Sequence, residues 1–99
     1  MTEFQNLCYY MLKQHVPAGS VITYGNLAKL IGRPNAYRAV GSAMNKNKNA
    51  PEVPCHRVIK SNGDLGGYAF GSNLKQKRLQ EEGIKIVNNK VVNFKNFCL

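Results

Sequence analysis

Residues 23–45 read TYGNLAKLIGRPNAYRAVGSAMN, a stretch that indicates two short helices separated by a tight turn. Thr23 can cap the first helix, and Gly32 and Pro34 can end it. Asn35 can then cap the second helix. The apolar face of the first helix consists of Leu27, Ala28, Leu30 and Ile31. Two short helices joined in this way resemble a helix-turn-helix, whose second helix docks on duplex DNA.

The second of these helices has unusually small side chains. It offers Ala39, Gly41, Ser42 and Ala43, whereas helices that read base edges in the major groove carry Asn, Gln, Arg and Lys. A face of small residues lets the helix backbone approach a narrow groove closely, so contact with the minor groove and little reading of sequence are predicted. The alternative is that the small residues pack against another helix.

The chain is strongly basic. Its 14 Lys and Arg residues stand against five Asp and Glu, which gives a formal net charge of +9 and a pI near 9.8. Such a charge predicts a polyanionic partner, with nucleic acid as the first candidate. The hydrophobic content of 43% in 99 residues fits one folded domain with a small core, because the chain is too short for a second.

The cysteines and the chain start bear on compartment, metals and membranes. Cys8, Cys55 and Cys98 are an odd number of widely spaced thiols, and no apolar leader follows a basic N-terminus. An intracellular protein is therefore expected, cytoplasmic in a prokaryote or nuclear in a eukaryote. No stretch approaches the roughly 18 apolar residues of a membrane span. His15 and His56 are far apart and no Cys-x2-Cys pair exists, so we expect no metal and no cofactor.

Helical spacing and turn residues predict elements on both sides of the helix pair. Thr2 and Gln5 have the spacing of a capping box, so a first helix should run from about residue 3 to His15. Residues 58–65, with a turn at 61–64, suggest a small hairpin or an extended arm that returns through Leu65.

The C-terminal third is predicted to hold one more helix and a hairpin. The helix should begin with Ser72 or Asn73 as its cap and end at Gly83. Asn88-Asn89-Lys90 is a turn that tolerates positive φ, so residues of about 84–94 should form a β-hairpin.

These elements define a fold class and a map of the chain. The prediction is a mainly α protein with short β-hairpins, a winged helix-turn-helix-like single domain over residues 1–99. The helix-turn-helix covers about 24–46, the candidate active-site segment 54–59 and the C-terminal hairpin about 84–94.

The segment 54–59 reads PCHRVI and places a thiol beside an imidazole. Pro54 fixes the backbone that enters the cysteine, so Cys55 should sit at a defined bend rather than inside a helix. His56 can take the thiol proton and leave a thiolate, which is the nucleophilic form of cysteine. A buried, unreactive cysteine is the alternative.

Several fragments together resemble the DNA-binding catalytic domain of the O6-alkylguanine-DNA alkyltransferases. The resemblance extends over nearly the whole chain, and we expect the chain to be that domain alone. Such a domain has the same extent as the alkyltransferase-like proteins, which have another residue in place of the cysteine and only bind damaged DNA. The fragments that carry it are 21–25, 38–41, Asn47, 54–58, 66–68 and 81–83.

The resemblance implies a chemistry for the site. Cys55 would accept the alkyl group from the guanine oxygen irreversibly, with His56 withdrawing the thiol proton through a water and Glu82 orienting His56. Tyr24 would protonate guanine N3, and the backbone amide of Ala69 would face the oxygen. The protein would be consumed in one turnover.

The resemblance also implies a mode of DNA binding. The target nucleotide would flip out of a duplex that carries O6-alkylguanine, Arg38 would enter the stack through the minor groove, and Tyr24 would crowd the 3′ phosphate. Asn47 would brace the helix-turn-helix, and Val58 and Tyr68 would wall the pocket. Where many members have serine and glycine, this chain has Ala69 and Phe70 at the pocket rim. The groove-lining residues would be Ala39, Gly41, Ser42 and Met44.

Three other functions fit parts of the pattern. The first is a lesion-binding protein that signals to another repair pathway without transfer, against which the presence of Cys55 argues. The second is a winged-helix regulator, which would need base-reading side chains and usually dimerisation. The third is a cysteine hydrolase, for which the sequence shows no acyl-binding pocket. The expected protein is a monomer, and cooperative binding on DNA stays open.

Overall fold

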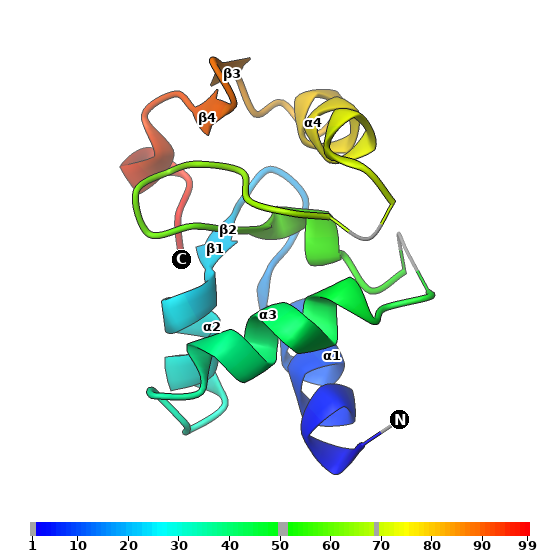
Figure 1. The fold of residues 1–99 in the computed structure, drawn as a ribbon. Coiled ribbons are helices and arrows are strands. Elements are labelled where there is room, and N and C mark those ends of the chain that lie inside the picture. Colours follow the sequence, from blue (N-terminus) through cyan, green and yellow to red (C-terminus); the bar gives the residue numbers. More distant parts are fainter. Residues whose placement is uncertain (1, 50–51, 69) are drawn as a thin grey trace.

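A computed structural model of the chain describes residues 2–49, 52–68 and 70–99. Figure 1 shows the first three helices gathered at one end of the molecule, the last helix and a hairpin at the other, and two short strands between them. The elements are α1 (Glu3–His15), β1 (Ile22–Thr23), α2 (Tyr24–Leu30), α3 (Tyr37–Asn45), a 3-10 turn (Cys55–Arg57), β2 (Val58–Ile59), α4 (Ser72–Glu81), β3 (Ile86–Val87), β4 (Lys90–Val91) and a second 3-10 turn (Phe94–Asn96). The predicted class, mainly helical with short strands, is confirmed.

The helices α1 and α2 begin where side chains accept hydrogen bonds from their free backbone amides. Thr2 and Gln5 form both hydrogen bonds of the capping box at the start of α1, and the Thr23 side chain accepts from the Asn26 amide at the start of α2. Asn35 was the predicted cap of α3, and this is wrong. Ala36 occupies that position and no side chain caps the helix, so the register of α3 is set by packing of its buried face rather than by a cap.

The two central strands pair in parallel, with Ile22 opposite Val58 and Thr23 opposite Ile59. The turn predicted after β2 is present in the structure. The amide of Lys60 donates across it to the carbonyl of Asp64 at 2.8 Å. Of the two alternatives for residues 58–65, the hairpin is wrong, since β2 pairs with β1. Both residues of β2 are buried, and strands buried on both faces are typical of parallel pairing at the centre of a fold.

The C-terminal part follows the sequence prediction except at the N-terminal cap of α4. Gly71, with φ +99°, stands at the cap position of α4 and Ser72 is already helical, so neither Ser72 nor Asn73 caps the helix. Gly83 ends the helix region with φ +90°, as predicted. Asn88 and Asn89 both have positive φ in the turn that joins β3 to β4, which confirms the hairpin.

The core consists of two buried clusters separated by the β1–β2 ladder. Consecutive strand residues point to opposite faces, so Ile22 and Val58 belong to one cluster while Val21 and Ile59 belong to the other. Cys55 belongs to the first cluster, which also contains residues of α1 and α3. The candidate active-site segment therefore lies at the junction of the two halves. Over the parts of the chain described above, no helix is both long enough and apolar enough to cross a membrane.

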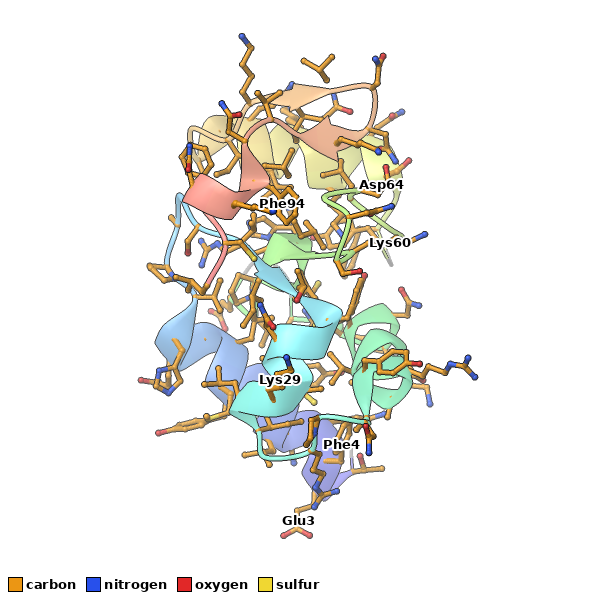
Figure 2. All side chains as sticks on the ribbon, turned by 90° about the vertical axis from the view of Figure 1, so that its left-hand side faces the viewer. Glu3, Phe4, Lys29, Lys60, Asp64 and Phe94 are labelled. Carbon is orange, nitrogen blue, oxygen red and sulfur yellow. The ribbon has the colours of Figure 1, made fainter. Side chains whose placement is uncertain are left out.

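The turn that follows β2 gives a stability prediction. Gly63 has φ +91°, and a Cβ there would come within 2.9 Å of the Phe94 ring. Figure 2 shows Phe94 at the level of Lys60 and Asp64, the ends of this turn. We expect Gly63→Ala to lower the free energy of unfolding by about 1–3 kcal/mol.

Gly25→Ala is the matched control, because Gly25 lies in α2 with no heavy atom within 4 Å of an added Cβ. We expect this change to raise the free energy of unfolding by up to about 1 kcal/mol. Urea denaturation of both variants measures the difference. Equal stabilities would contradict the close packing of the turn on Phe94.

Candidate active site

Cys55 begins the 3-10 turn between Pro54 and β2 and is 2% exposed. The Asn47 side chain, just beyond the end of α3, donates from Nδ2 to the Val53 carbonyl at 3.0 Å and to the Cys55 sulfur at 3.2 Å. An amide N–H aimed at sulfur favours the thiolate over the thiol. Asn47 thus joins the end of α3 to the cysteine segment, the position predicted for it.

His56 is 1% exposed, and its Nε2 lies 3.0 Å from Oε2 of Glu82. Because a carboxylate only accepts hydrogen bonds, this contact places the ring proton on Nε2 and leaves a lone pair on Nδ1. Nδ1 is buried and has no hydrogen-bond partner among the described residues. Burial lowers the pKa of His56 and outweighs the opposing contact with Glu82, so the ring is neutral at pH 7. Nδ1 is therefore able to accept a proton.

Glu82 stands at the C-terminus of α4 and is shared by two partners. Arg57 donates from Nε to Oε1 at 2.9 Å and from Nη2 to Oε2 at 2.6 Å, and its Nη1 donates to the Val16 carbonyl at 2.7 Å. Burial alone would raise the pKa of Glu82, but the hydrogen bonds from Arg57 and His56 lower it. The carboxylate is therefore ionised at neutral pH, and it fixes the orientation of His56.

Tyr24, the first residue of α2, lies between α3 and the loop before α4. Its ring lies 3.9 Å from a Cβ built at Gly41, and its hydroxyl 3.3 Å from one built at Gly66. Burial raises the pKa of Tyr24 and the neighbouring Cys55 raises it further, so the phenol is protonated at neutral pH. A hollow of about 450 Å³ opens beside it between α2, α3 and the turn after β2. Its lining is Tyr24, Gly25, Tyr37, Lys60, Ser61 and Asn62.

Three of the four residues predicted at the wall and rim of the pocket are among those that the structure describes. Val58 is buried in the core cluster that contains Cys55, and Tyr68 packs against that cluster. The Tyr68 hydroxyl accepts from Nη1 of Arg78 at 2.5 Å, and its ring centroid lies 5.3 Å from that of Phe70, which is 42% exposed. Ala69, whose amide was predicted to face the guanine oxygen, lies outside the described residues.

The predicted groove-facing residues divide into two sets on α3. Arg38, Ala39 and Ser42 are exposed, and Gly41 is half-buried beside Tyr24. Met44 is buried in the core, so its inclusion among the groove-lining residues is wrong. It lies four residues after Val40, and residues at that spacing share a helix face, here the one that packs inward.

Sequence analysis missed three side chains around the site. Arg57 orients Glu82, Arg78 contacts Tyr68, and Lys75 on α4 is fully buried. The signal for Lys75 was its position four residues before Leu79, which puts both on the buried face of α4. No three His, Cys, Asp or Glu side chains within 2–49, 52–68 and 70–99 gather closely enough to hold a metal ion.

Comparison with known proteins identifies the family. Residues 3–84 match the sequence model described as "6-O-methylguanine DNA methyltransferase, DNA binding domain". The chain belongs to this family. A methylated-DNA–protein-cysteine methyltransferase of Methanosarcina acetivorans is 52% identical over 82 residues, which are 83% of this chain and 52% of the relative. One of Salmonella typhimurium is 48% identical over 83% of this chain and 47% of the relative. The chain spans about half the length of these curated relatives.

Two solved structures are similar to this fold. The Mycobacterium tuberculosis OGT in complex with DNA has a TM-score of 0.80 and 44% identity, over 83% of this chain and 50% of that one. S. pombe Atl1 in complex with damaged DNA containing O6-carboxymethylguanine has a TM-score of 0.87 and 32% identity, over 100% of this chain and 96% of that one. The fold of this chain is thus similar to those of two proteins whose structures are complexes with DNA.

The shared carboxylate gives a stability prediction. Glu82→Gln removes the charge that Arg57 and His56 contact, so we expect a loss of about 2 kcal/mol in the free energy of unfolding at pH 7. Since the folded-state pKa of Glu82 is lowered, this contribution is complete above the ordinary value of about 4.5 and is lost as the pH falls through the folded-state value.

Glu81→Gln is the matched control, because Glu81 is exposed and adjacent. Denaturant titrations of both variants and the wild type at pH 7 and at pH 3 measure the effect. The gap between wild type and Glu82→Gln should narrow at the lower pH, while Glu81→Gln should match the wild type. A gap that does not change with pH would contradict an ionised Glu82.

Proposed function

We propose that this chain repairs DNA by direct reversal, transferring an alkyl group, chiefly methyl, from O6-alkylguanine to Cys55. The observation that carries the proposal is the buried Cys55–His56–Glu82 arrangement, in which the Glu82 carboxylate holds Nε2 of the residue next to the thiol and leaves the buried Nδ1 without a hydrogen-bond partner among the described residues. Such an arrangement is typical of an activated cysteine nucleophile.

The step is an in-line displacement. His56 takes the proton of Cys55 through a water, and the thiolate attacks the alkyl carbon. A sulfur–carbon bond forms while the carbon–oxygen bond breaks, and its electron pair stays on the guanine. Tyr24 donates its proton to guanine N3, and the proton held by His56 restores the phenol. Overall, one proton is transferred from the thiol to the base, and the base becomes unmodified guanine.

The product is a thioether, and none of the described residues of the site is a group that could remove an alkyl substituent from sulfur. Each molecule therefore reacts once, and the amount of protein sets the number of lesions repaired.

The proposed substrate is a duplex that carries O6-alkylguanine, bound through the minor groove by a monomer. The exposed small residues Ala39 and Ser42 of α3 allow the groove to approach the helix, and the net charge of +9 favours DNA. The nucleotide must flip, because a stacked base cannot reach a buried thiol. Arg38 is exposed on the same helix and would fill the place of the flipped base.

A second function, lesion binding without transfer, is favoured by one comparison. The likeness to S. pombe Atl1 extends over the whole of this chain. The presence of Cys55 beside an oriented His56 favours transfer, since binding alone requires neither group.

Intact-protein mass spectrometry tests the proposed transfer. On mixing with a duplex that contains one O6-methylguanine, the wild type should gain a single methyl group in proportion to the DNA, and Cys55→Ser should gain none. Tight lesion binding without a mass change would move the protein to the lesion-binding class. Neither mass change nor lesion preference would contradict both functions.

Arg38 provides a test of nucleotide flipping. Because flipping costs a few kcal/mol, Arg38→Ala should slow transfer from duplex DNA by about tenfold or more. Transfer from the free base O6-methylguanine needs no flipping and should keep its rate. Arg38→Lys retains the charge, so a full recovery of duplex transfer by lysine would show that charge alone explains the effect. Single-turnover rates on both substrates measure the difference.

A further inference from the structure

Arg78 is a half-buried arginine on α4 that the proposed reaction does not use. Glu81 and Glu82 follow it at three and four residues, the spacing at which oppositely charged side chains of a helix lie close enough to pair. Both ion pairs found in the described part of the chain involve Glu82, and neither involves Arg78. The Arg78 guanidinium contacts Tyr68 instead.

Two contacts join the Tyr68 side chain to Arg78. Nη1 of Arg78 donates to the Tyr68 hydroxyl at 2.5 Å, and the guanidinium carbon lies 5.9 Å from the centroid of the ring. The first contact fixes the hydroxyl, and the second is at the distance of a cation–π interaction. The Tyr68 ring also lies 5.3 Å from the Phe70 ring, tilted by 58°, as aromatic pairs favour. These three side chains therefore form one continuous set of contacts.

The segment that carries Tyr68 is rich in glycine. Three of the six residues 66–71 are glycine, which leaves the backbone free and adds no side-chain contacts. Two hydrogen bonds tie this backbone to α4, since the Gly71 amide donates to the Tyr68 carbonyl at 3.1 Å and Nζ of Lys75 donates to the Gly67 carbonyl at 3.1 Å. Neither bond involves the Tyr68 side chain. That side chain is held by its own contacts, and its hydroxyl is held by the guanidinium.

Tyr68 is the point at which these contacts meet the cysteine site, because it packs against the core cluster that contains Cys55. Arg78 also lines a hollow of about 280 Å³ beside His56 and Glu82. The site can therefore depend on Arg78 in two ways, through the position of Tyr68 or through a positive charge near His56. The direct contacts are those with Tyr68.

We propose that Arg78 is a positioning residue, and that its two contacts hold the Tyr68 ring as the fixed wall that places the target base at Cys55. This role rests on the proposed function, since the base to be placed is O6-alkylguanine. It deepens that function, because it names the group that lets a glycine-rich segment present a rigid surface to a flat ring. Arg78 acts through Tyr68 and touches neither the base nor the thiol.

A double-mutant cycle separates the two ways in which Arg78 can act. Single-turnover transfer from the free base O6-methylguanine is measured for the wild type, Arg78→Met, Tyr68→Phe and the double variant, so that affinity for DNA does not enter. Each single change should slow transfer by about tenfold, since each removes the hydrogen bond between the charged donor and the hydroxyl. The double variant should be no slower than either single variant, because both changes break the same contact.

Lys77→Met is the matched control, because Lys77 is exposed on the same helix and the change removes the same charge. It should keep the wild-type rate. A wild-type rate in Arg78→Met would overturn the proposal. A double variant slowed by the product of the two single effects would also overturn it, because Arg78 would then act through its charge and independently of Tyr68.

The second test asks, without alkylguanine, whether Arg78 fixes the wall. Cys55 is 2% exposed, so iodoacetamide reaches its sulfur only when the residues around it move. Peptide mass spectrometry follows the rate at which Cys55 is modified, and this rate should rise about fivefold or more in Arg78→Met but not in Lys77→Met. Cys8 is 0% exposed and serves as the internal reference. An unchanged rate at Cys55, or an equal rise at Cys8, would overturn the proposal.

Circular dichroism shows whether Arg78→Met is folded. If it is not, Arg78→Leu replaces it in both tests with the same expected results. If Cys55 becomes more reactive in Arg78→Met but the wild type gains no methyl group from O6-methylguanine, the proposed function fails alone. If the wild type gains the methyl group and Arg78→Met reacts at wild-type rates in both tests, the role of Arg78 fails alone.

Discussion

The site depends on one carboxylate with two partners. Glu82 receives two hydrogen bonds from Arg57 and one contact from His56, so the end of α4 is fixed to the 3-10 turn that carries the cysteine. Arg57 extends this connection to the Val16 carbonyl, beyond the end of α1. The same contacts keep Glu82 ionised, and the ionised carboxylate determines which nitrogen of His56 is free to accept a proton. Fold and chemistry thus depend on the same hydrogen bonds.

A small core makes this arrangement costly. The chain has 99 residues, and a domain of this size buries a modest share of its surface, yet His56, Asn47 and Lys75 are all buried around Cys55. Each has hydrogen-bond partners on neighbouring elements, which is the condition under which buried polar groups are tolerated. These hydrogen bonds connect elements on both sides of the β1–β2 ladder.

The parts of the fold that sequence analysis predicted depend on neighbouring residues. The capping box at Thr2 and Gln5, the cap at Thr23 and the positive-φ turn at Asn88 and Asn89 are all local. The errors concern tertiary contacts. Asn35 has the chemistry of a cap, but α3 begins one residue after Ala36 because its inner face packs on the core. The pairing of β2 with β1 joins segments 36 residues apart in register, which no local pattern indicates.

The site shows the same division. The motif around Cys55 predicted the nucleophile and its histidine, and family resemblance alone suggested Glu82, which lies 26 residues away. Lys75 was missed because a lysine among helix-forming residues is normally exposed. The measurement that tests the account most directly follows the atoms of a deuterated methyl group on guanine O6. If the transfer occurs as proposed, the label is found on the Cys55 peptide and the DNA contains unmodified guanine. Label on Cys8 or Cys98, or label that stays on the DNA, would contradict it.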